Sequence, residues 1–257
     1  MITSYREIIP KLASRIELVM TDVDGTLTDA SDSISSVVSE SIRRLEDGGV
    51  IVGLVSGRTL PGLESLASDL GISGPIIAEN GGVAKLKVNG KLLDMGYSRK
   101  PALEALEKLR TLFPDAIEER EDNSYRMVDV VLWSHGVDVN RLRRYLDDAE
   151  LVDSGYILHL VQKGVSKGRT LIMLLRHIAD GRLSPADIMV FGDSLTDLSL
   201  FEMFPNSVLI VNPRHAPEHM GTLHNACRYI SELSLGDGFA QVASHIMDGR
   251  ISPEVMK

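Results

Sequence analysis

The chain has 257 residues, of which 44% are hydrophobic and 25% are charged, an ordinary composition for a globular protein with a sizeable core. Its formal net charge of −9 argues against nonspecific binding to nucleic acid or to an anionic membrane, and no apolar run is long enough to span a bilayer. The residues from Met1 to Arg15 lack the apolar segment of a signal peptide, so we expect a cytoplasmic protein, and Cys227, the single cysteine, has no internal disulfide partner.

The first part of the chain alternates between buried strands and amphipathic helices, and each strand ends in polar or glycine-rich residues. This pattern is typical of a doubly wound parallel sheet. The expected strands are Leu18–Thr21, Val50–Val55 and Pro75–Ala78, and the expected helices are Ser35–Asp47 and Leu60–Leu70.

The rhythm changes after the third strand, where Asn89-Gly90 predicts a tight hairpin between Val83–Val88 and Lys91–Met95. A helix, a strand, a second helix and a second strand are then expected at Pro101–Leu112, Tyr125–Leu132, Val137–Asp147 and Gly155–Val161. We interpret residues 83–160 as an inserted α+β domain with its own antiparallel sheet.

The parallel pattern then resumes with a helix at Lys167–His177, strands at Asp187–Phe191 and Val208–Val211, and a last helix at Phe239–Met247. The predicted fold class is therefore α/β, with a doubly wound parallel-sheet core formed by residues 1–82 and 161–257.

Asp22 and Asp24 follow the first apolar strand, and side chains two residues apart on an extended strand point the same way. One carboxylate can attack phosphorus, and the other can protonate the leaving oxygen and later activate water. A hard cation such as Mg2+ would hold the first against the phosphate. Gly25 permits a sharp exit from the strand, and Thr26 offers a hydroxyl and an N–H to the transferred group. The alternative is a polar turn with solvated acids.

Three further strings follow strands or begin helices. Ser56 and Gly57 can grip a phosphate oxygen, and Lys167 at a helix start is explained by a local anion, although a turn serine and a solvated lysine are the plain alternatives. Asp193 can complete a magnesium site with Asp22 and the backbone carbonyl of Asp24, and Asp197 is a second metal ligand or an orienting acid. The alternative for this last string is a capped helix start.

Four strings of this sequence together resemble the four motifs of the haloacid dehalogenase-like phosphatases. They are Asp22-Val23-Asp24-Gly25-Thr26, Ser56-Gly57-Arg58, Lys167-Gly168 and Gly192-Asp193-Ser194-Leu195-Thr196-Asp197. The insertion, and Glu79-Asn80-Gly81-Gly82 before it, resemble the branch with a C2B cap (Cof-type, IIB). The segment Gly155-Tyr156-Ile157-Leu158-His159-Leu160 looks most like archaeal-type phosphoglycolate phosphatases, with sucrose-phosphatase-like and mannosyl-3-phosphoglycerate phosphatase members close behind.

The resemblance implies that Asp22 is nucleophile and Mg2+ ligand, that Asp24 is general acid and base, and that Asp193 binds metal with support from Asp197. It also implies that Ser56 and Lys167 hold the phosphate. One position departs from the branch, because Thr196 stands where asparagine is common, and this puts its contact with the phosphate or with Lys167 in question.

Substrate selection is expected to fall to the cap, which closes over the site and excludes water. The candidate substrate-binding residues are Arg58, Asn80, Tyr125, Arg126 and His159. A guanidinium such as that of Arg126 suits a carboxylate, which would favour phosphoglycolate, whereas a cap lined with Asn, Asp and Gln would favour a sugar. His159, in an apolar strand, is alternatively a packed and hydrogen-bonded histidine.

The sequence thus predicts a Mg2+-dependent phosphatase of a small phosphorylated metabolite that works through an aspartyl-phosphate intermediate. Phosphoglycolate is the first substrate expected and a sugar phosphate is the second. A phosphomutase and a non-catalytic sugar-phosphate sensor are the alternatives from other classes, and the protein is expected to be a monomer or a homodimer.

Overall fold

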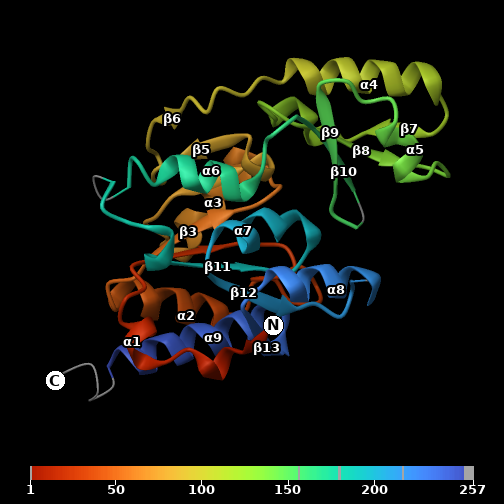
Figure 1. The fold of residues 1–257 in the computed structure, drawn as a ribbon. Helices are drawn as coiled ribbons and strands as arrows, with labels where there is room; N and C mark the ends of the chain where they lie inside the picture. Colours follow the sequence, from red (N-terminus) through yellow and green to blue (C-terminus); the bar gives the residue numbers. More distant parts are fainter. Residues whose placement is uncertain (1, 156, 179–180, 216, 252–257) are drawn as a thin grey trace.

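The computed structural model describes residues 2–155, 157–178, 181–215 and 217–251, and within them the chain forms two β-sheets flanked by helices (Figure 1). The large sheet has nine strands in the order β1-β13-β12-β11-β2-β3-β4-β5-β6. Their bounds, in that order, are Thr3–Ser4, Tyr229–Ser234, Asn206–Val211, Ile188–Gly192, Leu18–Thr21, Ile51–Val55, Ile76–Ala78, Val83–Lys85 and Leu92–Leu93.

In this sheet order, all strands from β1 through β13, β12, β11, β2 and β3 to β4 run parallel. The apolar sequences of β2 and β11 are buried on both faces. One face packs against α2, α3 and α9, and the other against α6, α7 and α8. These helices span Ser36–Asp47, Leu60–Leu70, Leu235–Arg250, Lys167–Leu174, Leu198–Met203 and Pro217–Ala226, and the short α1 spans Pro10–Ala13. The predicted doubly wound α/β core is confirmed.

The second sheet is antiparallel, with strands in the order β7-β8-β10-β9, and it packs against α4 and α5 around a small apolar core of its own. The strands span Ile117–Glu119, Val130–Ser134, Leu158–Gln162 and Ala149–Asp153, and the helices span Lys100–Leu112 and Val139–Arg143. We call residues 100–162 the outer unit. It lies above the large-sheet body in Figure 1.

The structure corrects the place of the hairpin at residues 83–95. Its two strands pair with each other, but Lys85 pairs with Leu92, so residues 86–91 form a longer loop and the predicted tight hairpin at Asn89-Gly90 is wrong. Strand β5 also pairs antiparallel with β4, so the hairpin extends the large sheet and does not belong to the inserted sheet. The sequence Asn89-Gly90 favours a turn but sets neither the register of the two strands nor the sheet edge that they join.

Other element bounds in the outer unit also differ from the predictions. The strand predicted at Tyr125–Leu132 begins only at Val130, because Glu121–Tyr125 forms a 3-10 turn, and the helix predicted at Val137–Asp147 is limited to Val139–Arg143. Strands β7 and β9 were not predicted. Tyr156, part of the string that carried the resemblance, lies outside the described residues. In the described chain, no helix has the length and apolar character needed to cross a membrane.

Candidate active site

The four strings converge at the carboxyl ends of β2, β3 and β11, the edge at which open α/β sheets bind ligands. Gly25 makes this convergence possible in two ways. Its φ of +84° is one that glycine adopts readily, and a Cβ at this position would lie 2.5 Å from both Asn212 Nδ2 and Asp193 Oδ2. The loop after β2 therefore lies directly against the loops after β11 and β12.

Lys167 is the centre of the buried charge cluster. Its side chain is 1% exposed, and its ammonium donates to Asp22 Oδ1 at 2.8 Å and to Asp197 Oδ1 at 2.7 Å. It also donates to Thr196 Oγ1 at 3.2 Å, so threonine at this position keeps a contact with the lysine. Lys167 is the first residue of α6, whose N-cap is Ser166, and the helix start fixes where the side chain begins.

Asp197 positions the loop that carries Asp193. Its Oδ2 accepts hydrogen bonds from the backbone N–H groups of Asp193 and Ser194, both at 3.1 Å, while its Oδ1 accepts from Lys167. Both oxygens of this fully buried carboxylate are therefore engaged. Asp197 therefore fills both predicted roles: it is the acid in the first turn of a capped helix start, and it orients the loop that carries Asp193.

Asp193 receives hydrogen bonds from two residues that the sequence analysis did not select. Asn212 Nδ2 lies 2.7 Å from Asp193 Oδ2, and His215 Nε2 lies 2.5 Å from the same oxygen, while the Thr26 hydroxyl donates to Oδ1 at 3.1 Å. Asn212 follows directly after β12, so its position at a strand end was the signal that could have identified it. Pairing with Asp193 raises the pKa of His215.

The cluster has more negative charge than Lys167 can neutralise. Asp22, Asp193 and Asp197 are all buried, and each can offer one oxygen within 4.8 Å of those of the others. Burial raises the pKa of Asp22 well above its usual range, and the neighbouring acids add to this effect against the opposing attraction of Lys167. Burial alone would lower the pKa of Lys167, but Asp197 and Asp22 raise it, so the lysine stays charged. Oxygen ligands in excess of the local positive charge fit a hard divalent cation such as Mg2+.

The carboxylate of Asp24 does not belong to this cluster and pairs with Arg58 instead. Arg58 Nε lies 2.9 Å from Oδ2 and 3.2 Å from Oδ1, and Arg58 Nη2 lies 2.5 Å from Oδ1. The two side chains are 35% and 33% exposed, so this pair lies at the open side of the site.

The loop after β3 approaches Asn80, which follows β4. Ser56 is buried, and its hydroxyl oxygen accepts the N–H of Arg58 at 3.2 Å. A Cβ on Gly57 would lie 3.1 Å from Asn80 Nδ2 and 3.2 Å from His159 Cε1, so only a residue without a side chain fits easily between them. Asn80 has a φ of 55°, and its buried Nδ2 has no hydrogen-bond partner among the described residues. A buried donor without a partner is costly, and an oxygen of a ligand would satisfy it.

Arg126 and His159 reach this loop from the outer unit, each held by acids. Arg126 Nη1 donates to the Gly57 carbonyl at 3.0 Å and to Asp129 Oδ1 at 2.8 Å, and its Nη2 donates to Asp122 at 2.8 Å. His159 Nδ1 lies 2.7 Å from Asp129 Oδ2. Leu158 and Leu160 on either side pack into the outer unit's core, so the alternation of β10 turns His159 to the other face.

We call Asp122, Arg126, Asp129 and His159 the Arg126 network. Burial alone would raise the pKa of Asp129, but His159 and Arg126 hold it below its usual range. Tyr125, by contrast, is 68% exposed, and the structure does not bring it to this site.

Glu79 joins the large-sheet body to the outer unit. Its carboxylate, at the end of β4, accepts backbone N–H groups from three consecutive residues of the outer unit, Met127, Val128 and Asp129, at 2.7–3.1 Å. Burial and the nearby Asp129 raise the pKa of this carboxyl against the lowering effect of these bonds.

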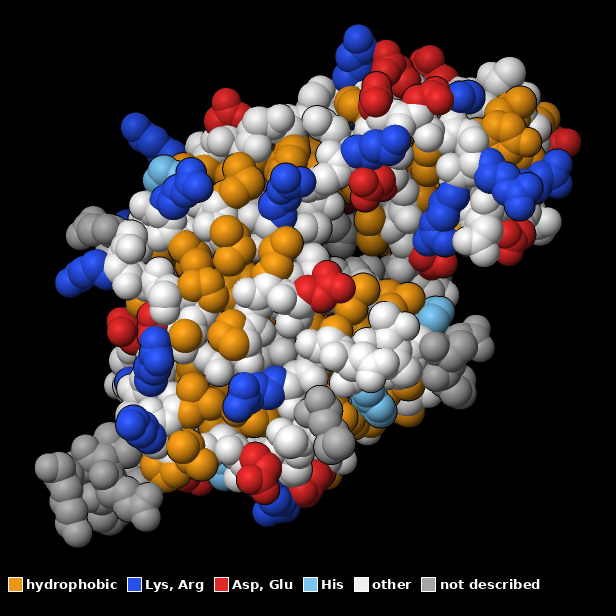
Figure 2. Space-filling view, viewed as in Figure 1, with side chains coloured by type: hydrophobic (Ala, Val, Ile, Leu, Met, Phe, Trp, Pro, Cys, Tyr) orange, Lys and Arg blue, Asp and Glu red, His pale blue; other side chains and the backbone are white. Residues whose placement is uncertain are grey.

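A cleft of about 300 Å³ lies between the outer unit and the large-sheet body. It is lined by Arg143, Leu151, Val152, Asp153, Ser154 and Gly155 from the outer unit and by Ser194, Leu195, His215 and His219 from the body. Figure 2 shows the hollow that separates these two parts. Because Ser194 and His215 adjoin Asp193, the cleft opens beside the buried cluster.

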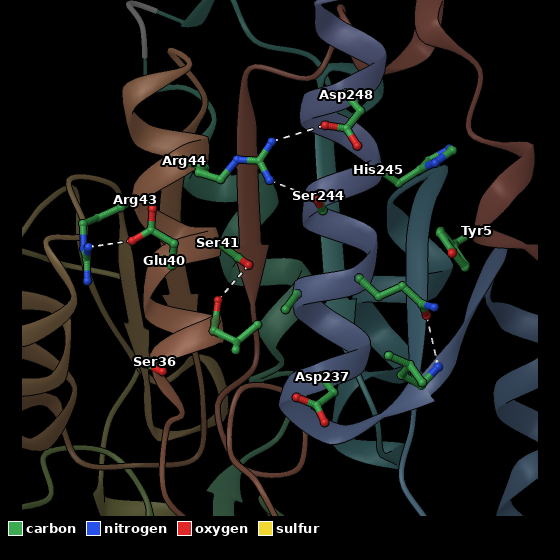
Figure 3. Close-up of a pocket in the computed structure, with 14 residues that line it drawn as sticks. Tyr5, Ser36, Glu40, Ser41, Arg43, Arg44, Asp237, Ser244, His245 and Asp248 are labelled. Atoms are coloured by element: carbon green, nitrogen blue, oxygen red, sulfur yellow. Dashed lines mark hydrogen bonds and ion pairs between the residues drawn. The ribbon is translucent and has the colours of Figure 1, made fainter.

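A larger groove, of about 920 Å³, lies elsewhere, between α2 and α9 (Figure 3). Its charged side chains pair within the groove, Arg44 with Asp248 and Arg43 with Glu40. It contains none of the predicted site residues.

Comparisons with known proteins agree with this arrangement. The family model described as haloacid dehalogenase-like hydrolase matches residues 19–147 and 140–241. A protein named phosphoglycolate phosphatase from Methanoculleus marisnigri is 35% identical over 88% of this chain and 94% of its own, and one of the same name from Thermoplasma volcanium is 32% identical over 90% and 98%.

Solved structures match as well. A Thermoplasma acidophilum protein superposes with a TM-score of 0.76 at 27% identity, covering 90% of this chain and 98% of its own. A putative HAD/COF-like hydrolase from Plasmodium vivax has a TM-score of 0.72 at 17% identity over 93% and 99%, which shows the shared fold.

The chain therefore belongs to the haloacid dehalogenase-like hydrolases. Within this family it is a phosphatase, and the sequence-based assignment to the Cof-type branch is confirmed.

Proposed function

We propose that this phosphatase hydrolyses phosphoglycolate, or a similarly small phosphorylated carboxylic acid, through an aspartyl-phosphate on Asp22. The observation that carries the proposal is the ammonium of Lys167 between Asp22 and Asp197, with Asp193 in the same buried cluster. Relatives named phosphoglycolate phosphatase match nearly the full chain, which supports this substrate over a sugar phosphate.

In the proposed reaction, Asp22 attacks phosphorus, the bond from phosphorus to the ester oxygen breaks, and Asp24 gives its proton to that oxygen. Lys167 occupies Asp22 Oδ1, so we assign the attack to Oδ2. Asp24 then takes a proton from water, which attacks the acyl phosphate and releases inorganic phosphate and free Asp22. The Ser56 hydroxyl and the Asn80 amide are the donors that we assign to the phosphoryl oxygens.

The proposed Mg2+ ligands are the carboxylates of Asp22 and Asp193, which offer oxygens within 4.8 Å of each other. Asp197 is assigned to hold the loop that carries Asp193, through its bonds to the backbone N–H groups of Asp193 and Ser194. Bound there, Mg2+ would supply the positive charge that lets a carboxylate and a phosphate approach each other. The outer unit is proposed to act as the cap that excludes water, with Arg126 and His159 held against the loop after β3.

The test compares Asp22→Asn with Asp248→Asn, a matched change at a side chain that is 66% exposed in the groove between α2 and α9. With Mg2+ present, Asp22→Asn should abolish phosphate release from phosphoglycolate while the protein stays folded by circular dichroism, and Asp248→Asn should keep it. EDTA should silence the wild type, and added Mg2+ should restore it. Turnover by Asp22→Asn would remove Asp22 as the nucleophile, and full activity in EDTA would remove the metal.

A further inference from the structure

Two of the basic side chains beside the site are already paired with acids of the outer unit. Arg126 is 6% exposed and lies between Asp122 and Asp129, and His159 shares Asp129 with it. Moving either side chain onto a ligand would take one of its two partners from the buried Asp129, which is costly. A substrate carboxylate therefore needs another receptor.

Arg58 is the basic side chain in direct contact with Asp24, the proposed acid and base. Its guanidinium donates to both oxygens of Asp24, at 2.5 to 3.2 Å. A leaving oxygen that approaches the Asp24 carboxyl along this edge competes with these bonds. Because the pair lies at the open side of the site, an incoming anion can reach the guanidinium.

The chemistry of a phosphorylated 2-hydroxy acid matches this pair of neighbours. In such a substrate the carboxylate is only one carbon away from the ester oxygen, so the group that protonates this oxygen and the group that binds the carboxylate must lie side by side. Asp24 and Arg58 are in direct contact, and a guanidinium fork suits a carboxylate.

We propose that Arg58 is the specificity-determining residue, and that its guanidinium passes from Asp24 to the carboxylate of the substrate, which frees Asp24 to act on the ester oxygen. The guanidinium therefore has a carboxylate partner before and after the exchange. A phosphate ester without a carboxylate cannot drive the exchange. This inference rests on the proposed function and adds the substrate's second anchor to it.

The experiment compares phosphoglycolate with 2-hydroxyethyl phosphate, which has the same length but carries an alcohol in place of the carboxylate. In Arg58→Gln, kcat/KM for phosphoglycolate should fall about 100-fold, the size of loss typical of a charge-assisted bidentate pair. The value for 2-hydroxyethyl phosphate should fall by less than about threefold or should rise. Arg58→Lys, which keeps the charge and loses the fork, should recover only part of the loss.

The matched control is Arg143→Gln, a guanidinium that lines the cleft from the outer unit and does not contact Asp24. It should leave the ratio of the two kcat/KM values unchanged. Equal losses on both esters in Arg58→Gln, no loss on either, a wild type without preference for phosphoglycolate, or a selective loss in Arg143→Gln would each overturn the inference. If the wild type hydrolyses 2-hydroxyethyl phosphate in an Asp22-dependent way, the phosphatase chemistry stands even then, whereas hydrolysis of neither ester refutes the proposed function itself.

Discussion

Replacing Lys167 with methionine should unfold the chain more easily as well as inactivate it. The ammonium is 1% exposed and is the cation that contacts two buried carboxylates, at 2.8 and 2.7 Å. Removing one partner of a buried ion pair costs about 3–5 kcal/mol, because the remaining charge is left uncompensated. For a chain of this size, each kcal/mol lowers Tm by about 2–4 °C, so the expected drop is roughly 6–20 °C.

This penalty should depend on pH in a known direction. Lys167 lowers the pKa of Asp22, so its loss raises further a pKa that burial already holds above the ordinary value of 3.8. A carboxyl whose pKa is higher in the folded than in the unfolded protein destabilises the fold when the pH is above the folded pKa. This destabilisation disappears when the pH is below the unfolded pKa. The difference in unfolding free energy between wild type and variant should therefore shrink as the pH falls from 8 towards 4.

The assay is urea unfolding in EDTA at several pH values, followed by circular dichroism. Lys163→Met is the control, since Lys163 is exposed and lies four residues earlier, and it should change the free energy of unfolding by less than about 0.5 kcal/mol. A Lys167→Met loss below 1 kcal/mol, or one that is the same at pH 8 and pH 4, would refute the reasoning.

Three further predictions concern single side chains. Burial raises the pKa of Cys227 to about 11, so Ellman's reagent at pH 8 should label the thiol only after unfolding, and rapid labelling of the native protein would contradict this. Gly168→Ala should destabilise the protein by more than about 2 kcal/mol in urea unfolding, because the new Cβ would lie 2.1 Å from the Ser199 carbonyl oxygen. Gly221→Ala, where α8 leaves open space for a Cβ, should stabilise it by about 0.5–1 kcal/mol, and equal effects of the two substitutions would contradict this reasoning. Asp129→Asn should lower the free energy of unfolding by about 3 kcal/mol at pH 7. Because the pKa of Asp129 is held low, the difference in unfolding free energy between variant and wild type should narrow as the pH falls below about 4. A difference that stays constant with pH would show that the carboxylate charge is not its source.

The sequence predicted most of the large sheet, because local signals specify it. The strands β2, β3 and β11 are apolar runs that end in polar residues, and the predicted bounds of α3, Leu60–Leu70, are those observed. Parallel strands end at one edge, so the order of the four strings sufficed to predict that Asp22, Lys167 and Asp193 lie together.

Several pairings were beyond the sequence, even between residues that are close in the chain. Arg126 pairs with Asp122, four residues before it, and with Asp129, three residues after it, but these contacts arise only because the chain turns at Glu121–Tyr125 and then enters β8. The attachment of the hairpin to β4 likewise depends on a free sheet edge, which no local pattern encodes. His215 gave no local signal, since it lies in a loop three residues after Asn212.

The bonds of Glu79 limit how this enzyme can evolve. Three successive main-chain amides of the outer unit end on one carboxylate of the body, so side-chain changes at Met127 and Val128 leave this connection intact. Side chains of the outer unit can thus change by point substitution on a constant backbone frame, whereas a different inserted segment would keep this connection only if its backbone offered three amides to Glu79.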